Sequence, residues 1–256
     1  MRSLTSSLRA RATGILVAGG AAAALFGGCD GTPETVTVEG TAVDHGRALF
    51  EDATIAGTEF NQYSCATCHT GESVEDDVIR PGGSLRGVTE RPYYWGGQEV
   101  DLLRAVNACL YWFMLVDEPW TAEDERARAV YAYLESISDG PEGTEAAPFT
   151  IVLNIADLPP GDAKRGADAY RRACAECHGQ VHTGADRIVD RAPVLPDQTL
   201  SEHPLGEYTE DERRLVFVEK ARHGAFISYT GQMPPFSLEA LPDEDMADIL
   251  QYLDLY

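Results

Sequence analysis

The sequence is poor in basic residues and in cysteine, and each shortage excludes a class of protein. Its 256 residues include 20 Lys and Arg against 42 Asp and Glu, a formal net charge of −22. This charge argues against a nucleic-acid partner, because phosphate binding needs a basic surface. Six cysteines are too few for a disulfide scaffold. Disorder is also excluded, because 44% of the residues are hydrophobic and aromatic side chains occur in both halves.

Long hydrophobic runs are lacking too, and the one apolar run near the N-terminus predicts export. Residues 15–26 form an apolar stretch that follows Arg2, Arg9 and Arg11. It is shorter than the roughly 20 residues that a membrane span requires. A basic start, a short apolar stretch and small residues beyond it are typical of a secretory signal. We therefore predict that residues 1–28 are a signal peptide and that the mature protein is periplasmic or otherwise extracytoplasmic.

Cys29 stands at the end of this predicted signal. Residues 25–29 (Leu-Phe-Gly-Gly-Cys) resemble a bacterial lipoprotein signal, in which the cysteine is lipidated and becomes the first residue, with Phe26 in place of the usual leucine. Residues 29–40 would then tether the protein to a membrane. The alternative is ordinary cleavage nearby, which leaves Cys29 as a free thiol. Removal of residues 1–28 leaves 17 basic against 42 acidic residues, a net charge of −25.

The rest of the chain repeats one plan twice. Each copy has an opening helix, a Cys-x-x-Cys-His motif, a loop-rich middle and a closing helix. In the first copy the opening helix is residues 44–50, the motif is residues 65–69 and the closing helix is residues 121–137. In the second copy the corresponding segments are residues 163–170, 174–178 and 243–255. The closing segments have apolar residues at helical spacing and acidic residues near their start.

The duplication predicts a mainly α fold made of two tandem helical domains. Residues 41–138 form the first and residues 161–256 the second, with a Gly-, Pro- and Glu-containing linker at residues 139–160. Residues 149–153 are the one convincing strand candidate. Domains of about 100 residues bury a limited core. A bulky apolar cofactor at the centre of each domain would complete that core.

The repeated pentapeptide carries the chemistry. Two cysteines three residues apart lie on one face of a helical turn, so both thiols can form thioether bonds to the two vinyl groups on one edge of a haem. The next residue, a histidine, then lies under the iron as its proximal ligand, and the pattern is that of c-type haem attachment. The predicted attachment residues are Cys65, Cys68, Cys174 and Cys177, and the proximal ligands are His69 and His178.

The same cysteines allow two other interpretations. The four thiolates could bind zinc, or each pair could be a thioredoxin-like redox site. Zinc does not explain a histidine directly after both pairs, and neither pair lies in a β-α-β pattern. Two c-type haems, each with iron, therefore explain more of the sequence than either alternative.

Each haem iron needs a sixth ligand or an open position, and the chain has only four methionines. Met233 lies in a Gly- and Pro-rich loop, 55 residues past His178, where a thioether can be held against an iron without a competing helix. We predict that Met233 ligates the second iron. Met246, inside the closing helix, is expected to be ordinary packing.

The sixth ligand of the first iron has two candidates. Met114 follows His69 by 45 residues and precedes the first closing helix, as Met233 precedes the second. Its neighbours are apolar, so core packing is an alternative role for it. Cys109 competes with it, because a thiolate also ligates haem iron. We predict Met114 as the ligand and keep Cys109 as the alternative.

With these residues the sequence resembles the class I cytochromes c, arranged as a di-haem protein. The match is strongest in the second copy, over Gly166, Tyr170, residues 174–179 and 192–196, Met233-Pro234 and residues 247–253. The resemblance implies ligation by His178 and Met233 and a glycine–aromatic crossing of the first and last helices at Gly166, Tyr170 and Tyr252. In the first copy, residues 105–114 are similar to di-haem cytochromes of bacterial sulfur oxidation, in which a cysteine at this place ligates iron.

These expectations predict an electron carrier and no catalytic residue. Ligation by histidine and methionine saturates the iron and raises its potential, which suits electron transfer. The acidic surface is expected to steer the protein toward redox partners with basic docking surfaces. The alternative function is a di-haem oxidoreductase, a peroxidase or a sulfur-compound oxidising enzyme, with its chemistry at the first haem.

Overall fold

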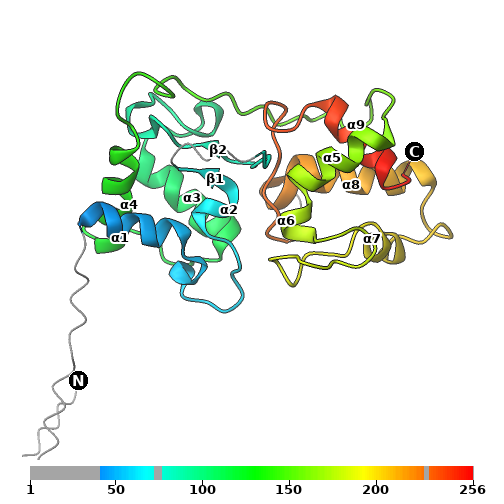
Figure 1. Ribbon diagram of the computed structural model, residues 1–256, viewed down its shortest axis with the longest axis horizontal. Helices are drawn as coiled ribbons and strands as arrows, with labels where there is room; N and C mark the ends of the chain where they lie inside the picture. The colour runs from blue at the N-terminus through cyan, green and yellow to red at the C-terminus, as the bar shows by residue number, and fades with distance from the viewer. Residues whose placement is uncertain (1–40, 72–76, 228–230, 256) are drawn as a thin grey trace, which may run out of the picture. The chain divides into compact units, whose positions relative to one another are not determined.

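The structure is a computed structural model that describes residues 41–71, 77–227 and 231–255, and it is mainly helical (Figure 1). The predicted mainly α fold class is confirmed. The predicted signal peptide, the tether and Cys29 lie outside the described residues. The helices are α1 (Ala42–Glu51), α2 (Cys65–Cys68), α3 (Leu102–Met114), α4 (Glu125–Ser136), α5 (Ala163–Ala173), α6 (Ala175–His178), α7 (Asp197–Glu202), α8 (Glu210–Ile227) and α9 (Asp243–Tyr252). Short 3-10 helices lie at Ala53–Ala56, Val88–Glu90 and Trp95–Gly97, and the strands β1 (His69–Thr70) and β2 (Gly83–Ser84) pair in parallel.

The first half is built on the crossing of α1 and α4. Gly46 lets the two helices approach closely, because a Cβ there would lie 2.6 Å from the backbone carbon of Ala129 and 2.8 Å from the Cβ of Tyr133. Next to this contact the rings of Phe50 and Tyr133 pack with centroids 5.2 Å apart. The closing helix was expected from residue 121 but begins at Glu125, because the Asp124 carboxylate accepts the Arg126 N–H at 2.9 Å and caps the helix there.

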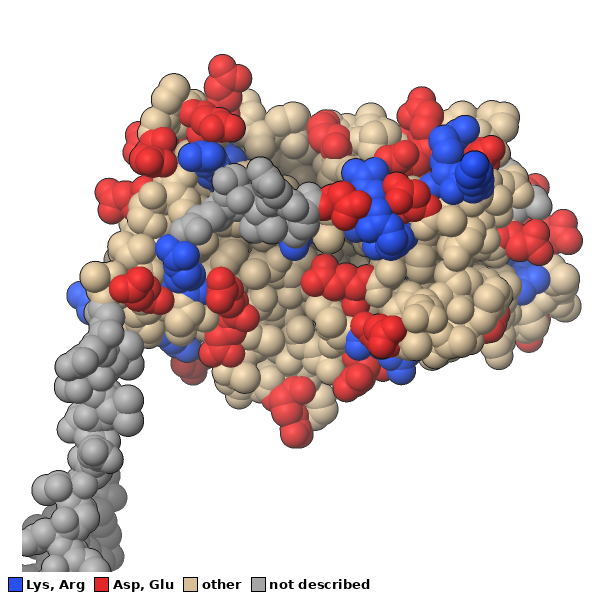
Figure 2. Space-filling view, in the orientation of Figure 1, with Lys and Arg blue, Asp and Glu red and all other residues tan. Residues whose placement is uncertain are grey.

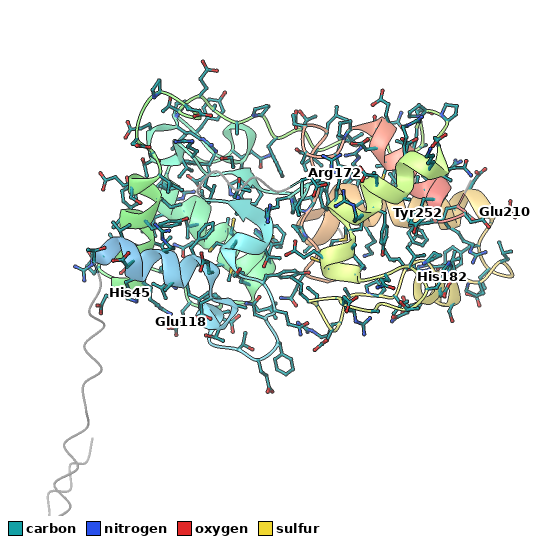
Figure 3. The ribbon with its side chains drawn as sticks, in the orientation of Figure 1. His45, Glu118, Arg172, His182, Glu210 and Tyr252 are labelled. Atoms are coloured by element: carbon teal, nitrogen blue, oxygen red, sulfur yellow. The ribbon has the colours of Figure 1, made fainter. Side chains whose placement is uncertain are left out.

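The second half repeats this crossing with α5 and α9. A Cβ on Gly166 would lie 2.8 Å from the Cβ of Tyr252, and the rings of Tyr170 and Tyr252 pack with centroids 5.7 Å apart (Figure 3). The buried carboxylate of Asp248 ties the helices together, since it accepts from Arg165 Nε at 2.6 Å and from Nη2 at 2.8 Å. The glycine–aromatic crossing that the resemblance implies is therefore present, and the first half has its own version of it.

The strand predicted at residues 149–153 is wrong. These residues have no strand pairing. Hydrogen bonds to the chain near residue 238 hold them instead: Thr150 donates from its N–H to Glu239 Oε2 at 2.9 Å and from its hydroxyl to Oε1 at 2.6 Å, and its carbonyl accepts the Leu238 N–H at 3.0 Å. The apolar, β-branched composition of the segment therefore reflects packing of an extended linker.

Each half contributes side chains to the hydrophobic core of the other half. Val189 and Ala192 from the second half are buried in the cluster around Phe50 of the first half, and Cys177 packs against the same cluster. In return, Ile79 of the first half packs against the second core. The described residues of the two halves accordingly belong to one compact unit.

Polar contacts join the same two halves. The backbone N–H of Ile79 donates to the carbonyl of Arg172 at 2.9 Å, and Arg172 Nε donates to the carbonyl of Asp77 at 2.8 Å (Figure 3). Arg171 forms an ion pair with the Asp77 carboxylate at 2.5 Å. Within the described residues, none of the helices combines the length and the apolar character that a membrane span requires.

Candidate haem sites

The first Cys-x-x-Cys-His motif forms the single turn of α2 and the first residue of β1. Ser64 precedes the turn, and its N–H donates to the Thr67 hydroxyl at 3.1 Å, which is half of a capping box. Cys65 and Cys68 are the first and last residues of the turn. The local sequence therefore places both thiols on one face, as attachment to one edge of a haem requires.

His69 lies against the backbone of Gly82. A Cβ on Gly82 would lie 2.5 Å from Nδ1 and 2.7 Å from Nε2 of the imidazole, so only glycine leaves room for the ring. His69 Nδ1 is buried and has no hydrogen-bond partner among the described residues. Burial also lowers the pKa of His69 to about 4. The ring is therefore neutral at pH 7, the form that ligates a metal ion.

A cavity of about 410 Å³ lies beside this motif. Its size is in the range of small-molecule and cofactor sites, roughly 300–1,000 Å³. The wall is mainly apolar and includes Phe50, Leu85, Val88, Leu102, Val106, Leu110, Val130 and Leu134. Cys65, Cys68 and His69 lie on the same wall. Two thiols, a neutral imidazole and an apolar enclosure fit the predicted haem.

Both predicted sixth ligands of the first iron lie on α3. Asp101 caps this helix by accepting the Arg104 N–H at 2.8 Å. Cys109 lies inside the helix and Met114 is its last residue, and both line the first cavity. Met114 is 4% exposed and belongs to the first core. Burial, with a contribution from Cys65, raises the pKa of the Cys109 thiol to about 12.

The second Cys-x-x-Cys-His motif follows α5 and forms α6. Cys174 links the two helices, and Cys177 and His178 are the last residues of α6. His178 is buried, and burial lowers its pKa. Its Nδ1 lies 2.9 Å from the carbonyl of Pro193. Because a carbonyl only accepts, Nδ1 carries the proton and Nε2 keeps its lone pair for a metal.

The structure brings Met233 to this second motif. A small cavity of about 40 Å³ is lined by Cys174, Cys177, His178 and Met233. The donor set fits a c-type haem with histidine and methionine ligands. At about 40 Å³ the space is smaller than a macrocycle, so the fit rests on the donor set that lines it. The other late methionine, Met246, is buried in the second core, as expected for packing.

The two sites share a wall. Five residues line both cavities: Tyr63, Cys68, Arg80, Pro81 and Pro234. Cys68 thus belongs to the first motif and also borders the second site, while Pro234, next to Met233, borders the first. Burial, with contributions from Cys177 and Cys68, raises the pKa of Tyr63 well above its ordinary value. Neither Tyr63 nor the shared wall was predicted, because the contact joins residues far apart in the sequence.

Arg91 is a cation on the wall of the first cavity that the sequence alone did not indicate. Its Nε donates to the Gly143 carbonyl at 2.8 Å, and its Nη2 donates to the carbonyls of Ser84 and Arg86 at 2.9 Å. Burial lowers its pKa. No carboxylate of the described residues pairs with it, which leaves its charge available to an anionic group in the cavity.

The zinc alternative finds no matching arrangement. Within the described ranges, no three side chains of His, Cys, Asp or Glu gather as a metal-ion cluster. The two cysteine pairs instead line two separate cavities together with their own histidines.

Comparison with known proteins gives a family match for the segment that contains the second motif. Residues 161–253 match the family model of cytochrome c oxidase, cbb3-type, subunit III. No curated protein matches the chain. Among solved structures, the chain is similar to the thiosulfate dehydrogenase TsdBA from Marichromatium purpuratum in its as-isolated form, at 17% sequence identity and a TM-score of 0.40. That similarity covers 83% of this chain, which spans 45% of the length of the other. The chain thus contains, at residues 161–253, a cytochrome c family domain, the class of domain that holds an iron-containing c-type haem by covalent bonds.

Proposed function

We propose that this protein is a di-haem cytochrome c that carries electrons between redox partners. The observation that carries the proposal is the common wall of the two Cys-x-x-Cys-His cavities, in which Cys68 borders both. Each haem would supply a reversible one-electron couple, and the common wall supports a short path between the two couples. Electrons then enter at one site and leave from the other.

At the first site, Cys65 and Cys68 hold the haem edge by thioether bonds and His69 is the proximal ligand. Met114 is the proposed sixth ligand and Cys109 the alternative, since both line the cavity. Arg91 would pair with a haem propionate, because it lines the cavity and no carboxylate of the described residues pairs with it. The apolar wall excludes water from the iron.

At the second site, Cys174 and Cys177 hold the haem, and His178 and Met233 ligate the iron. The Pro193 carbonyl fixes the His178 ring by accepting from Nδ1. A methionine opposite a histidine saturates the iron and raises its potential. This site is therefore built for electron transfer, with no open position for a substrate.

A potentiometric titration of the purified holoprotein, followed optically, tests the proposal. We expect two reversible one-electron components of similar amplitude. In the Met233→Leu variant, one component moves to lower potential and the other keeps its position. A single component in the wild type, or none, would contradict the di-haem electron carrier.

An oxidoreductase with chemistry at the first haem is the second candidate function, and the position of Cys109 on the cavity wall favours it. Cys109→Ala and Met114→Leu variants separate the two ligands, because only loss of the true ligand alters the spectrum of the first haem. Two methionine-ligated haems, each with the weak far-red band of the oxidised form, would exclude the enzyme. A thiolate-ligated first haem would support it.

The proposed location is extracytoplasmic, where cytochrome c domains are typically found. We further propose that Cys29 carries a lipid that anchors the protein to a membrane. Metabolic labelling with radioactive palmitate tests this directly: the wild type takes up label and the Cys29→Ala variant does not. Equal labelling of both, or of neither, would show that Cys29 is not lipidated.

The proposed partners are redox proteins with basic docking surfaces. Acidic side chains outnumber basic ones over the face drawn in Figure 2, in keeping with the net charge of −22. Attraction between such surfaces accelerates encounter and is screened by salt. Electron-transfer rates with a basic redox protein should therefore fall as ionic strength rises. Rates that do not change with salt would contradict this docking mode.

A further inference from the structure

Among the described residues, Arg222 is the largest side chain that is fully buried, with 0% of its surface exposed. It lies on α8, and its Nη1 donates to the carbonyl of Leu241 at 2.6 Å and to the carbonyls of Phe236 and Ser237 at 3.3 Å. Its Nη2 forms an ion pair with Asp243 Oδ1 at 2.6 Å. Its Nε has no acceptor among the described residues. Burial of such a charge costs several kcal/mol unless partners offset it. The hydrogen-bond partners of Arg222 therefore indicate which part of the chain this side chain stabilises.

The hydrogen-bond partners of Arg222 all lie on the segment that follows residues 231–235, the described part of the loop that contains Met233 and is called the Met233 loop below. Residues 236–243 begin two residues after Pro234 and lead into α9, and apart from Asp243 they lie outside any helix or strand. The Leu241 N–H donates to the Ser237 carbonyl at 3.0 Å inside the segment, and the other carbonyls depend on donors from elsewhere. The planar guanidinium presents several N–H groups in a fixed fork, so a single side chain satisfies the carbonyls of three residues and the carboxylate at the start of α9.

The same turn of α8 also binds the chain at Met233 and directly after it. The Ala225 N–H donates to the Met233 carbonyl at 2.7 Å, and the Phe236 N–H donates to the Ala221 carbonyl at 2.8 Å. Gly224 has a φ of +51°, and a Cβ there would lie 2.8 Å from the carbonyl carbon of Pro234. Residues 221–225 thus hold the backbone of Met233 and of the residues that follow it.

We propose that Arg222 is a positioning residue that holds the Met233 loop so that the thioether faces His178. The inference rests on the proposed ligation of the second iron by His178 and Met233, and names the device that maintains it. Without the guanidinium, the carbonyls of Phe236, Ser237 and Leu241 each lose a donor, and the loop gains freedom to withdraw. The methionine then leaves the iron more often, the potential of the second haem falls, and added ligands compete more successfully for the open position.

The test compares Arg222→Gln and Arg222→Lys with Met233→Leu and with a matched control, all as full-length holoproteins. The control is Arg165→Gln, which breaks the ion pair with Asp248 in the same half of the molecule without touching the loop. Met233→Leu identifies the spectral and redox component of the second haem. Each protein is measured well below its unfolding temperature, with far-UV circular dichroism as the check on folding.

Three readouts separate positioning from general stability: the far-red methionine band, the potential of the second haem and its affinity for imidazole. Arg222→Gln is expected to weaken the band, shift the potential toward that of Met233→Leu, and raise the imidazole affinity about tenfold, which corresponds to about 1.4 kcal/mol. Arg222→Lys should fall between it and the wild type, because it keeps the charge but loses the fork. Arg165→Gln should lower the unfolding temperature and leave all three readouts unchanged.

Folded Arg222→Gln with wild-type values in all three readouts would overturn the proposal. If that variant does not fold, the same comparison with Arg222→Lys and Asp243→Asn decides, and unchanged readouts in both would overturn it. Equal shifts in Arg165→Gln would also overturn it, by showing that any weakening of this half has the same effect. If Met233→Leu itself changes nothing, the proposed ligation fails, and this result is distinct from failure of the positioning role.

Discussion

Replacement of Gly82 by alanine should displace His69 from its place in the first cavity. The added Cβ would lie 2.5 Å from Nδ1 and 2.7 Å from Nε2 of the imidazole. Ordinary contacts between such atoms are about 3.5–4.0 Å, so the ring has to move by about 1 Å. Overpacking of this kind costs about 1–3 kcal/mol. A histidine shifted by that amount binds the first iron less well.

The neighbouring glycine provides a matched control. A Cβ on Gly83 would meet nothing within 4 Å, although its φ of +64° makes alanine unfavourable there. Gly83→Ala should therefore lower stability by about 1 kcal/mol without moving His69. Gly82→Ala alone should alter the ligation of the first haem.

The assay is imidazole binding to the oxidised holoproteins, followed optically and combined with a redox titration. Gly82→Ala should bind imidazole at the first haem at least about tenfold more tightly than the wild type, which corresponds to about 1.4 kcal/mol, and the second component should keep its potential. Wild-type binding and potentials in folded Gly82→Ala would refute the placement of His69 against residue 82. Equal effects in Gly83→Ala would refute the steric explanation.

Three further predictions follow from single contacts. Gly166→Ala should lower the free energy of unfolding by about 1–3 kcal/mol in urea titrations, because its Cβ meets the α9 backbone, whereas Gly206→Ala, with open space around it, should change little. Arg91→Gln should lower the reduction potential of the first haem, because the lost cation disfavours the oxidised iron. Arg104→Gln, at an exposed arginine, is the control, and equal shifts in the two variants would contradict a specific effect of Arg91 on the first haem. Burial raises the pKa of Glu239, but hydrogen bonds from the linker outweigh this effect and lower it to about 2. Wild type should therefore be more stable than Glu239→Gln at pH 7, by under about 1 kcal/mol because the group is exposed. This difference in the free energy of unfolding should disappear as the pH falls from about 4.5 to about 2. A difference that persists at pH 2 would contradict the prediction.

The parts of the fold that local signals specify were predictable. The helical periodicity and capping residues indicated α1, α5 and α9, and the repeated Cys-x-x-Cys-His motif indicated both sites. These features depend on residues near one another in the chain. The crossing at Gly166, Tyr170 and Tyr252 joins distant residues, and it was expected from the resemblance to the class I cytochromes c.

Features set by distant partners were predicted less well. The expected strand at residues 149–153 is an extended linker, because its hydrogen bonds go to Glu239 and Leu238. Cys109 and Met114 share the helix α3, which lies in the middle segment that was expected to be rich in loops. The later start of α4 has a local cause, the capping of this helix by the Asp124 side chain.

Arg222 was missed although the sequence held a signal for it. It lies four residues after Val218, which is 1% exposed, and residues at this spacing share a helix face. A charged residue on an apolar face indicates a buried ionic contact. The identity of its partners, at residues 236–243, followed only from the packing of α8 against the Met233 loop.

The central claim is that both Cys-x-x-Cys-His motifs carry haem in one chain. Its most direct test is the intact mass of the mature holoprotein, followed by mass spectrometry of the tryptic peptides that contain residues 65–69 and 174–178. We predict a mass increase of two haems, with one haem on each peptide. A single haem, found only on the peptide with residues 174–178, would contradict the claim.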